Sequence, residues 1–364
     1  MSSLQPILNQ LQLQAFRSHL NFNLSFSPSV TLLVGSNGSG KSSVVEAVNL
    51  LSTGQSFRAG KIEEMIAFDQ ELARVLGKLK GDGDDQLEII LTRGLLQGKK
   101  VQKKYFELNG ARRRARDVRD LFYTVVFRPE DLRLVEGSPS RRRSFLDEVL
   151  SPLSLDYAHS LSTYEKTLIR RNKLLQAVRE REQSVTTLQF WNLSLIKHGR
   201  VLQTLRKEFL QFCLSVDFPI KLWVEYQPSL IDEERLEQYQ DREIAAGHTL
   251  IGPHKDDYVI ESDVQNMKRG SKNDFYNVAN FGSRGQQRLA VLWLKTCQLY
   301  YIQSKTQVRP MLLLDDILSE LDTDAREFAL SLMNVGQSLI TTASLGIAER
   351  IQRTFPACQK TLLT

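Results

Sequence analysis

The hydrophobic positions near the start of the chain predict a strand, a glycine-rich loop and a helix in direct succession. Leu11–Phe26 alternates weakly between apolar and polar residues, and Val30–Val34 is a short apolar run of the kind that forms a buried strand. Glycine and serine dominate the following positions, and apolar residues then recur at helical spacing over Lys41–Leu51. The chain therefore enters a helix from a strand through one flexible loop.

Further along, the pattern changes twice. Leu72–Leu108 alternates, with the turn-rich GDGDD in between, and predicts an antiparallel β-lobe over about 68–127. Apolar stripes from Tyr157 and from Trp191 predict two amphipathic helices of about 20–25 residues each. These helices form either the core of a helical domain or a short protruding hairpin, and the sequence leaves both open.

The last third of the chain returns to mixed patterns. Phe281–Gln303 has helical spacing, whereas Met311–Leu314 and Ser338–Thr342 are apolar strands. The sequence thus predicts an α/β fold in two domains, because 364 residues exceed one comfortable core. The first domain is discontinuous, 1–151 and 246–364, and a mainly helical domain, 152–245, is inserted into it.

Composition and charge narrow the class of protein. The net charge is +6, and the three cysteines lie far apart without a CxxC pair, so we expect neither a disulfide framework nor a zinc site. No apolar run approaches the ~18 residues that a membrane span needs, and the N-terminus does not resemble a secretion signal. We therefore expect a cytoplasmic protein without a membrane partner.

The loop after the first buried strand matches GxxxxGK[ST], the P-loop pattern, in its proper setting between strand and helix. Glycines let backbone N–H groups face phosphate oxygens, the lysine neutralises the outer phosphates, and the serine hydroxyl is a Mg²⁺ ligand. We expect ATP binding by Gly35, Ser36, Asn37, Gly38, Ser39, Gly40, Lys41, Ser42 and Ser43.

A second carboxylate is needed to complete the metal site, and MLLLDDILSELD (Met311–Asp322) supplies it at the end of an apolar strand. We expect Ser42 and Asp315 to hold Mg²⁺, and Asp316 to be the catalytic general base for an attacking water. An aspartate is one methylene shorter than a glutamate, so we expect slow hydrolysis.

Ser283, Arg284, Gly285 and Gln286 resemble the SGGQ signature of the ATP-binding-cassette (ABC) superfamily, with Arg284 in place of the first glycine. They stand at the start of a predicted helix, whose N-terminus attracts a γ-phosphate. In that superfamily the signature acts in trans, on the P-loop of a second copy. The resemblance therefore implies a homodimer formed with ATP.

The chain also resembles the RecF family, itself similar to the head domains of SMC-type ATPases. The shared strings are GQSFR (Gly54–Arg58), VVFRPEDLRLVEGSPSRRRSFLD (Val125–Asp147), LIRRNKLL (Leu168–Leu175), GPHKDD (Gly252–Asp257), SRGQQR (Ser283–Arg288) and LLLDDILSELD (Leu312–Asp322). The resemblance implies an ABC-type ATPase head with Asp322 in the D-loop at the dimer seam.

For function, the resemblance implies ATP-dependent binding of duplex, gapped or junction DNA and loading of RecA together with RecO and RecR. The enzyme would be a weak, DNA-stimulated ATPase. Ile340–Ser344 lacks the histidine that transporter-type cassettes place there, so no γ-phosphate-sensing histidine is assigned. No Q-loop glutamine is evident, and the sequence leaves open whether Pro129–Asp131 occupies that junction.

Basic residues gather between positions 99 and 119, where such a cluster displaces counterions from DNA or forms a solvated face. The expected DNA contacts are Lys103, Lys104, Arg112, Arg113 and Arg114. For Arg141–Arg143 we expect ion pairs with acidic neighbours instead. For GPHKDD we favour a structural turn over metal ligation by His254.

Three alternative functions remain at this point: a soluble ATPase subunit of an ABC transporter, a DNA-processing nuclease, and a nucleotide-gated scaffold without hydrolysis. The distance of ~240 residues between Lys41 and Ser283 and the missing histidine disfavour the transporter. No further acidic cluster is available for the two-metal site of a nuclease.

Overall fold

The computed structural model describes residues 6–81, 83–263 and 275–363. The chain forms two compact units, Met1–Asp131 with Gln298–Thr364, and Leu132–Cys297. The second unit contains the predicted insertion 152–245 and extends beyond it at both ends. One reason is that the helix before the insertion, α3 (Pro139–Leu153), packs against the first helix of the insertion, α4 (Leu155–Arg179), and against strand β12 (Asp257–Asp263).

A five-stranded parallel sheet lies at the centre of the first unit. Its strands, in spatial order, are β10 (Thr124–Phe127), β14 (Met311–Asp315), β15 (Ser338–Thr342), β3 (Val30–Gly35) and β16 (Gln359–Leu363). Strands of a parallel sheet covered on both faces have near-continuous apolar sequences. Runs such as VTLLV and MLLLD are therefore buried, and the α/β class predicted from the sequence is confirmed.

An antiparallel sheet forms the second layer of this unit. Its order is β2 (His19–Ser25), β1 (Ile7–Phe16), β4 (Leu72–Lys80), β5 (Asp84–Thr92), β8 (Lys104–Leu108) and β9 (Ala111–Arg113), and β6 (Leu95–Leu96) pairs separately with β7 (Lys99–Lys100). The predicted lobe of about 68–127 needs a correction at each end. β1 and β2 join it, and β10 pairs with β14 in the parallel sheet instead.

Helix α1 (Lys41–Thr53) contacts strands of both sheets and is buried along most of its length. Val44, Val48 and Leu51 belong to the same apolar core as residues of β1, β4, β14 and β15. At Gly77 of β4 an added Cβ would lie 2.8 Å from Leu51 Cδ1, so a larger residue would push this buried side chain aside where strand and helix approach. This packing fixes the end of the P-loop against the sheet.

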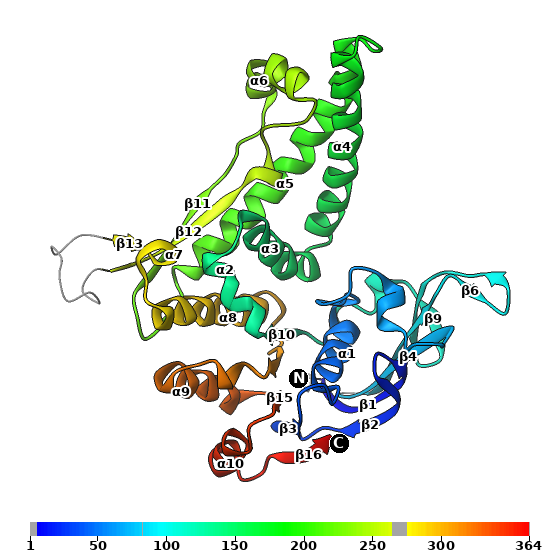
Figure 1. Cartoon of the computed structure of the whole chain (residues 1–364), viewed down its shortest axis with the longest axis vertical. Coiled ribbons are helices and arrows are strands. Elements are labelled where there is room, and N and C mark those ends of the chain that lie inside the picture. Colours follow the sequence, from blue (N-terminus) through cyan, green and yellow to red (C-terminus); the bar gives the residue numbers. More distant parts are fainter. Residues whose placement is uncertain (1–5, 82, 264–274, 364) are drawn as a thin grey trace. The chain divides into compact units, whose positions relative to one another are not determined.

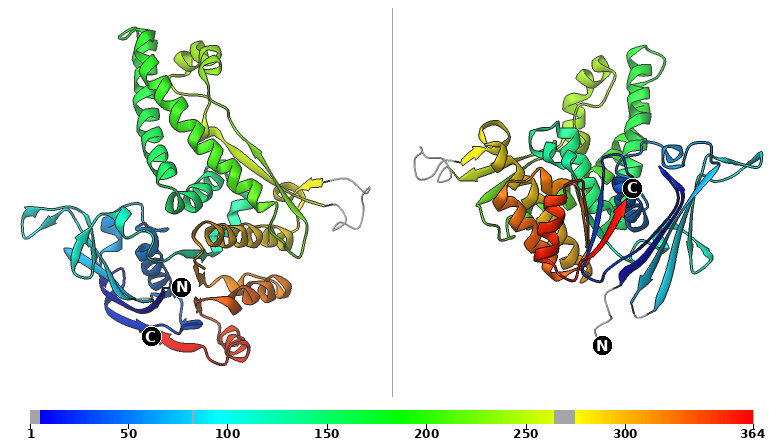
Figure 2. Two further views of the ribbon diagram at one scale, coloured as in Figure 1. Left: turned by 180° about the vertical axis from the view of Figure 1, so that it is seen from behind. Right: turned by 60° about the horizontal axis from the view of Figure 1, so that its bottom comes forward.

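The remaining elements of the first unit are short, apart from the end of α8 (Arg284–Thr306), which begins in the second unit. They are α9 (Thr323–Ser331), α10 (Leu345–Thr354), and the 3₁₀ turns Ile62–Met65, Ala115–Asp117, Pro129–Leu132, Ile317–Ser319 and Leu332–Val335. α10 packs on β15 and β3. Two further views show the layers of this unit (Figure 2).

The second unit is mainly helical and carries a three-stranded antiparallel sheet. Its further elements are α2 (Arg133–Glu136), α5 (Gln189–Cys213), β11 (Leu222–Gln227), α6 (Glu233–Ala246), β13 (Phe275–Asn277), α7 (Val278–Phe281) and the 3₁₀ turns Val185–Leu188 and Pro253–Lys255. α4 and α5 lie side by side (Figure 1), and each is 25 residues long, which agrees with the two helices of about 20–25 residues predicted from the sequence. In the described part of the chain, no helix combines the length and apolar character that crossing a bilayer requires.

Candidate nucleotide-binding site

The P-loop connects β3 to α1, and two of its glycines have backbone conformations that other residues rarely adopt. Gly38 and Gly40 have φ angles of 87° and 93°. A Cβ on Gly40 would lie 2.5 Å from His19 Nε2, and that ring nitrogen donates to the Gly40 carbonyl at 3.1 Å. His19 of β2 thus supports the loop from outside the motif, a contact that sequence reasoning missed.

Lys41 is the first residue of α1 and its side chain turns back over the loop. Its ammonium donates to the carbonyls of Gly35 and Ser36, both at 2.8 Å, and the residue is only 6% exposed. The hydroxyl of Ser39 is buried and has no hydrogen-bond partner among the described residues. A buried cation and an unpaired hydroxyl in one glycine-rich loop suit an anionic ligand.

Asp315 ends β14 and contacts the start of α1. Ser42 Oγ donates to Asp315 Oδ1 at 3.0 Å, and Thr341 Oγ1 donates to the same oxygen at 2.8 Å. The sheet register places Asp315 opposite Thr341 on β15. The P-loop and the MLLLDD stretch, more than 270 positions apart in sequence, therefore meet at this point. Thr341, which no sequence motif indicated, lies at the same contact.

Burial raises the pKa of the Asp315 carboxyl, and the hydrogen bonds from Thr341 and Ser42 oppose that shift. Two exposed charges also act on the carboxyl: Arg58 lowers its pKa and Glu130 raises it. Arg58 follows α1 in the string GQSFR, and Glu130 belongs to the turn Pro129–Leu132 at the expected Q-loop junction. Both side chains thus influence the site electrostatically, although neither was predicted as a site residue.

Asp316 has a left-handed backbone with φ at 53°, which few residues other than glycine adopt. Its N–H donates to the Thr341 carbonyl at 3.2 Å and to Thr341 Oγ1 at 3.1 Å. Thr341 therefore contacts both aspartates. Unusual backbone conformations cluster at functional sites, which makes Asp316 a candidate for function beyond its sequence position.

The donor set at Ser42 and Asp315 fits a magnesium ion. A hydroxyl and a carboxylate oxygen lie 3.0 Å apart, and Mg²⁺ prefers hard oxygen ligands of this kind. None of the ion pairs within the described residues includes Asp315, so the buried carboxylate lacks a cationic side-chain partner there. The remaining positions on such an ion are normally taken by water and phosphate.

The signature-like segment stands at the start of α8 in the second unit. Ser283 N–H donates to Gln286 Oε1 at 2.8 Å, and Gln286 N–H donates to Ser283 Oγ at 3.3 Å, which is a reciprocal capping arrangement. Ser283 and Arg284 are exposed, and Gly285 is half-buried. The segment is therefore a preformed helix N-terminus that solvent, or a partner, can reach.

Asp322 has a defined local role at the start of α9. Its Oδ1 accepts a hydrogen bond from Ala325 N–H at 2.9 Å, so the side chain caps the helix. This capping role explains why position 322 is an aspartate, and it requires no contact with a second copy of the chain. A D-loop role remains a prediction.

The five residues predicted to contact DNA lie in different environments. Lys103 forms an ion pair with Glu63, and Arg112 lies 3.9 Å from Glu107 and stacks on the Tyr105 ring. Lys104 donates to the Gly54 carbonyl at 2.6 Å, and burial lowers the pKa of its ammonium.

Arg113 and Arg114 are exposed, and no ion pair within the described residues includes them. These two residues remain the best candidates for DNA contact.

The GPHKDD segment and the arginine triplet pack together in the second unit. Arg142 forms two hydrogen bonds with Asp257, at 2.6 and 2.8 Å, and Arg143 donates to the Asp256 carbonyl at 2.9 Å. Asp256 is fully buried against Arg206, Tyr226 and Gln203. Among the described residues no group of three or more His, Cys, Asp or Glu could hold a metal, which favours the structural interpretation.

Comparison with known proteins places this geometry in a family. The RecF/RecN/SMC N terminal domain family matches residues 7–360. The DNA replication and repair protein RecF of Agathobacter rectalis is 30% identical over 352 residues, and that of Bacillus cereus (strain G9842) is 34% identical over 363 residues. In both comparisons the match covers 93% of this chain and 92% of the relative.

Solved structures agree with these relatives. The structure of the recombination mediator protein RecF-ATPrS in the RecFOR pathway has a TM-score of 0.80 and 28% identity, and the match covers 94% of each chain. An Smc head domain from Pyrococcus furiosus, at 16% identity and a TM-score of 0.51, shares the fold, with 99% of this chain and 94% of that one covered. The predicted ABC-type ATPase head is thereby confirmed, and the chain belongs to the RecF family.

Proposed function

We propose that this chain is an ATP-dependent DNA-binding protein of recombinational repair and replication restart. The observation that carries the proposal is the contact between Ser42 and Asp315 at 3.0 Å, which joins the P-loop to the end of β14. The names of the relatives support it, since they are DNA replication and repair proteins. The structural neighbour named with ATPrS supports ATP as the nucleotide.

In this proposal, ATP lies in the P-loop, residues 35–43, with Lys41 against its outer phosphates. Ser42 and Asp315 hold Mg²⁺, which neutralises phosphate charge when bound. Thr341 keeps the Asp315 carboxylate oriented through its 2.8 Å hydrogen bond. Asp316 serves as the general base that orients water for slow hydrolysis.

The signature segment acts in trans, on the nucleotide of a second copy. Three features of Ser283–Gln286 support this role: exposure, a capped helix N-terminus and the sequence SRGQ. A helix N-terminus attracts negative charge through its dipole and its free N–H groups. ATP therefore bridges two copies, and the homodimer is stable only while the γ-phosphate is present.

The dimer binds duplex, gapped or junction DNA through exposed cations such as Arg113 and Arg114, and hydrolysis releases the DNA. RecO and RecR are the proposed partners in helping RecA onto DNA. Family membership favours this role over the alternative of a soluble ATPase subunit of an ABC transporter.

Binding of fluorescein-labelled gapped duplex, followed by anisotropy with ATP, ADP or no nucleotide, tests the proposal. We expect ATP to tighten binding, and Lys41→Met to abolish that gain because the outer phosphates lose their cation. Lys173→Met, on the exposed surface of α4, is the matched control. Equal DNA affinity with ATP and ADP in the parent protein would refute ATP-gated binding.

A further inference from the structure

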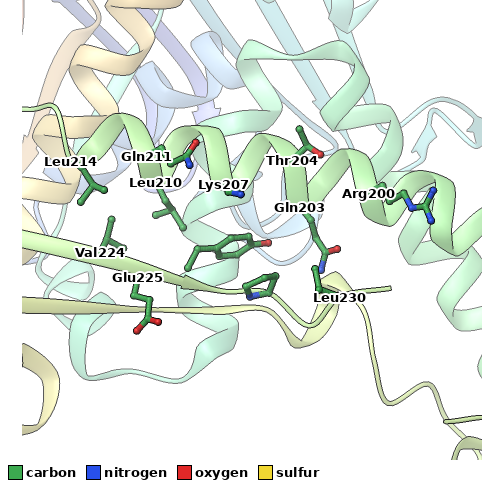
Figure 3. Close-up of a pocket in the computed structure, with 12 residues that line it drawn as sticks. Arg200, Gln203, Thr204, Lys207, Leu210, Gln211, Leu214, Val224, Glu225 and Leu230 are labelled. Carbon is green, nitrogen blue, oxygen red and sulfur yellow. The ribbon is translucent and has the colours of Figure 1, made fainter. Parts of the chain in front are cut away.

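A groove of about 610 Å³ lies in the second unit, between helix α5 and strand β11 (Figure 3). Arg200, Lys207 and Leu210 line it from α5, Leu214 lines it directly after the end of that helix, and Val224 and Glu225 line it from β11. It is independent of the P-loop and signature residues described above. Its volume is within the range of binding sites for small ligands and short peptide segments.

One wall of this groove is the edge of a β-strand. Val224, Glu225 and Tyr226 are consecutive, and side chains of consecutive strand residues point to opposite faces of the sheet. These three consecutive residues can therefore all line the same groove only if the groove runs along the edge of the strand. β11 is the terminal strand of its sheet in the described part of the chain, paired there with β12 alone. The groove thus presents backbone donors and acceptors that an added strand can pair with.

The base of the groove is rigid. Gln203 donates both to the Ser229 carbonyl and to Asp256 Oδ1 at 2.9 Å, and the Tyr226 hydroxyl donates to Asp256 Oδ2. Arg206 forms an ion pair with the same carboxylate at 3.0 Å. The GPHKDD segment thereby fixes α5 and β11 at the groove, which reduces the conformational entropy that the groove itself loses when a ligand binds.

The helix wall is cationic, with apolar positions at one end. Arg200 and Lys207 are both exposed and stand seven residues apart, about 10.5 Å along the helix. Arg200 lies 3.3 Å from Glu233 in an exposed ion pair, a type worth little in water. Lys207 belongs to none of the ion pairs within the described residues. Leu214 and Leu230, 50% and 49% exposed, add apolar surface.

We propose that this groove binds an extended acidic segment of a partner protein, which adds a strand along the free edge of β11. Main-chain hydrogen bonds to β11 supply affinity, as in other cases of strand addition. Carboxylates on alternate residues, about 6.7 Å apart, reach Arg200 and Lys207, and an apolar residue at one end of the segment contacts the half-exposed Leu214. The two lining cations, Arg200 and Lys207, outnumber the one lining carboxylate, Glu225, so charge complementarity selects an acidic segment over a basic one.

The probe for this proposal is a fluorescein-labelled nine-residue peptide of alternating glutamate and valine, titrated with the full chain by anisotropy. We expect it to bind, and a lysine–valine peptide not to bind. Lys207→Glu replaces attraction by repulsion and weakens binding about tenfold. Lys166→Glu on the exposed surface of α4 is the matched control and leaves binding unchanged.

Backbone N-methylation separates strand addition from simple charge attraction. In an antiparallel ladder, alternate residues face the neighbouring strand, so methylation of only one of the two alternate sets of amides abolishes binding. Equal binding by both methylated peptides, no binding of the parent peptide, or no effect of Lys207→Glu would overturn the proposal. A further result would overturn the proposal: duplex DNA displaces the peptide, and Lys207→Glu loses affinity for DNA. The α5 wall would then be a DNA contact.

Discussion

His254 of the GPHKDD segment is held neutral by its surroundings, and this makes the stability of the second unit dependent on pH. Nε2 lies 3.2 Å from the Thr249 carbonyl, which only accepts, so this nitrogen carries the proton. Nδ1 then accepts from the Tyr164 hydroxyl at 2.8 Å. The pKa of His254 is lowered from 6.5 to about 4, chiefly by burial and in addition by the cations Lys255, Arg143 and Arg171, while the bond to the Thr249 carbonyl opposes the shift.

A histidine whose pKa is lower in the folded protein costs stability as the pH falls. Above pH 6.5 the His254 imidazole is neutral in both the folded and the unfolded state. Between pH 6.5 and pH 4 the imidazole binds a proton in the unfolded chain but not in the folded one. At pH 5.5 the loss is about 1.4 kcal/mol, which shifts a urea midpoint by about 0.7 M for an m value of about 2 kcal/mol/M. His254→Gln retains a donor and an acceptor but does not titrate, so it removes this loss.

Tryptophan fluorescence is the suitable assay, because Trp191, Trp223 and Trp293 all lie in the second unit. Urea unfolding at pH 8 and pH 5.5 should show a larger drop in midpoint for the parent than for His254→Gln. An equal drop in both proteins would refute a neutral, buried His254. A midpoint lowered by EDTA at pH 8 would revive the metal interpretation, whereas the structural role predicts no effect.

Three further predictions concern the first unit. Asp316→Asn should lower phosphate release about 100-fold while ATP binding, measured by calorimetry, is retained; full turnover would remove Asp316 as the base. Thr341→Val should lower turnover about tenfold, because Asp315 loses a buried charge-assisted hydrogen bond; unchanged turnover would show that the bond does not orient the site. In duplex binding at several salt concentrations, Arg113→Gln with Arg114→Gln should reduce the salt slope by about 2, and Lys104→Gln should leave it unchanged. If Lys104→Gln reduced the salt slope and the two arginine substitutions did not, the DNA contact would lie at the buried Lys104.

Local chemistry explains why the nucleotide motifs were predictable. A P-loop needs its residues in one continuous stretch, and the aspartates after MLLL follow from the end of an apolar strand. The hydrogen bond between Ser42 and Asp315 brings together the two residues expected to hold Mg²⁺, although their strands are not neighbours, because β15 lies between β14 and β3. Both motifs consist of residues that are adjacent in sequence, so a single sequence is enough to find them.

Contacts between distant strands were not predictable in the same way. Thr341 reaches Asp315 because of the register between β14 and β15, and His19 reaches Gly40 from a different sheet. Lys104 belongs to a basic cluster in sequence, yet its ammonium bonds to the carbonyl of Gly54, fifty residues away. Thr124–Phe127 is a short apolar run that suits either sheet, and only pairing with β14 assigns it to the parallel one.

The claim that ATP joins two copies of the chain is tested most directly by the mass of the Asp316→Asn protein in solution, measured by light scattering with ATP and with ADP. We expect a dimer with ATP and a monomer with ADP, because each nucleotide contacts the P-loop of one copy and the signature of the other. Ser283→Arg should keep the protein monomeric with ATP, whereas Ser162→Arg on the exposed surface of α4 should still allow the dimer. A mass unchanged by ATP, or a dimer that survives Ser283→Arg, would contradict the claim that ATP joins two copies through the signature.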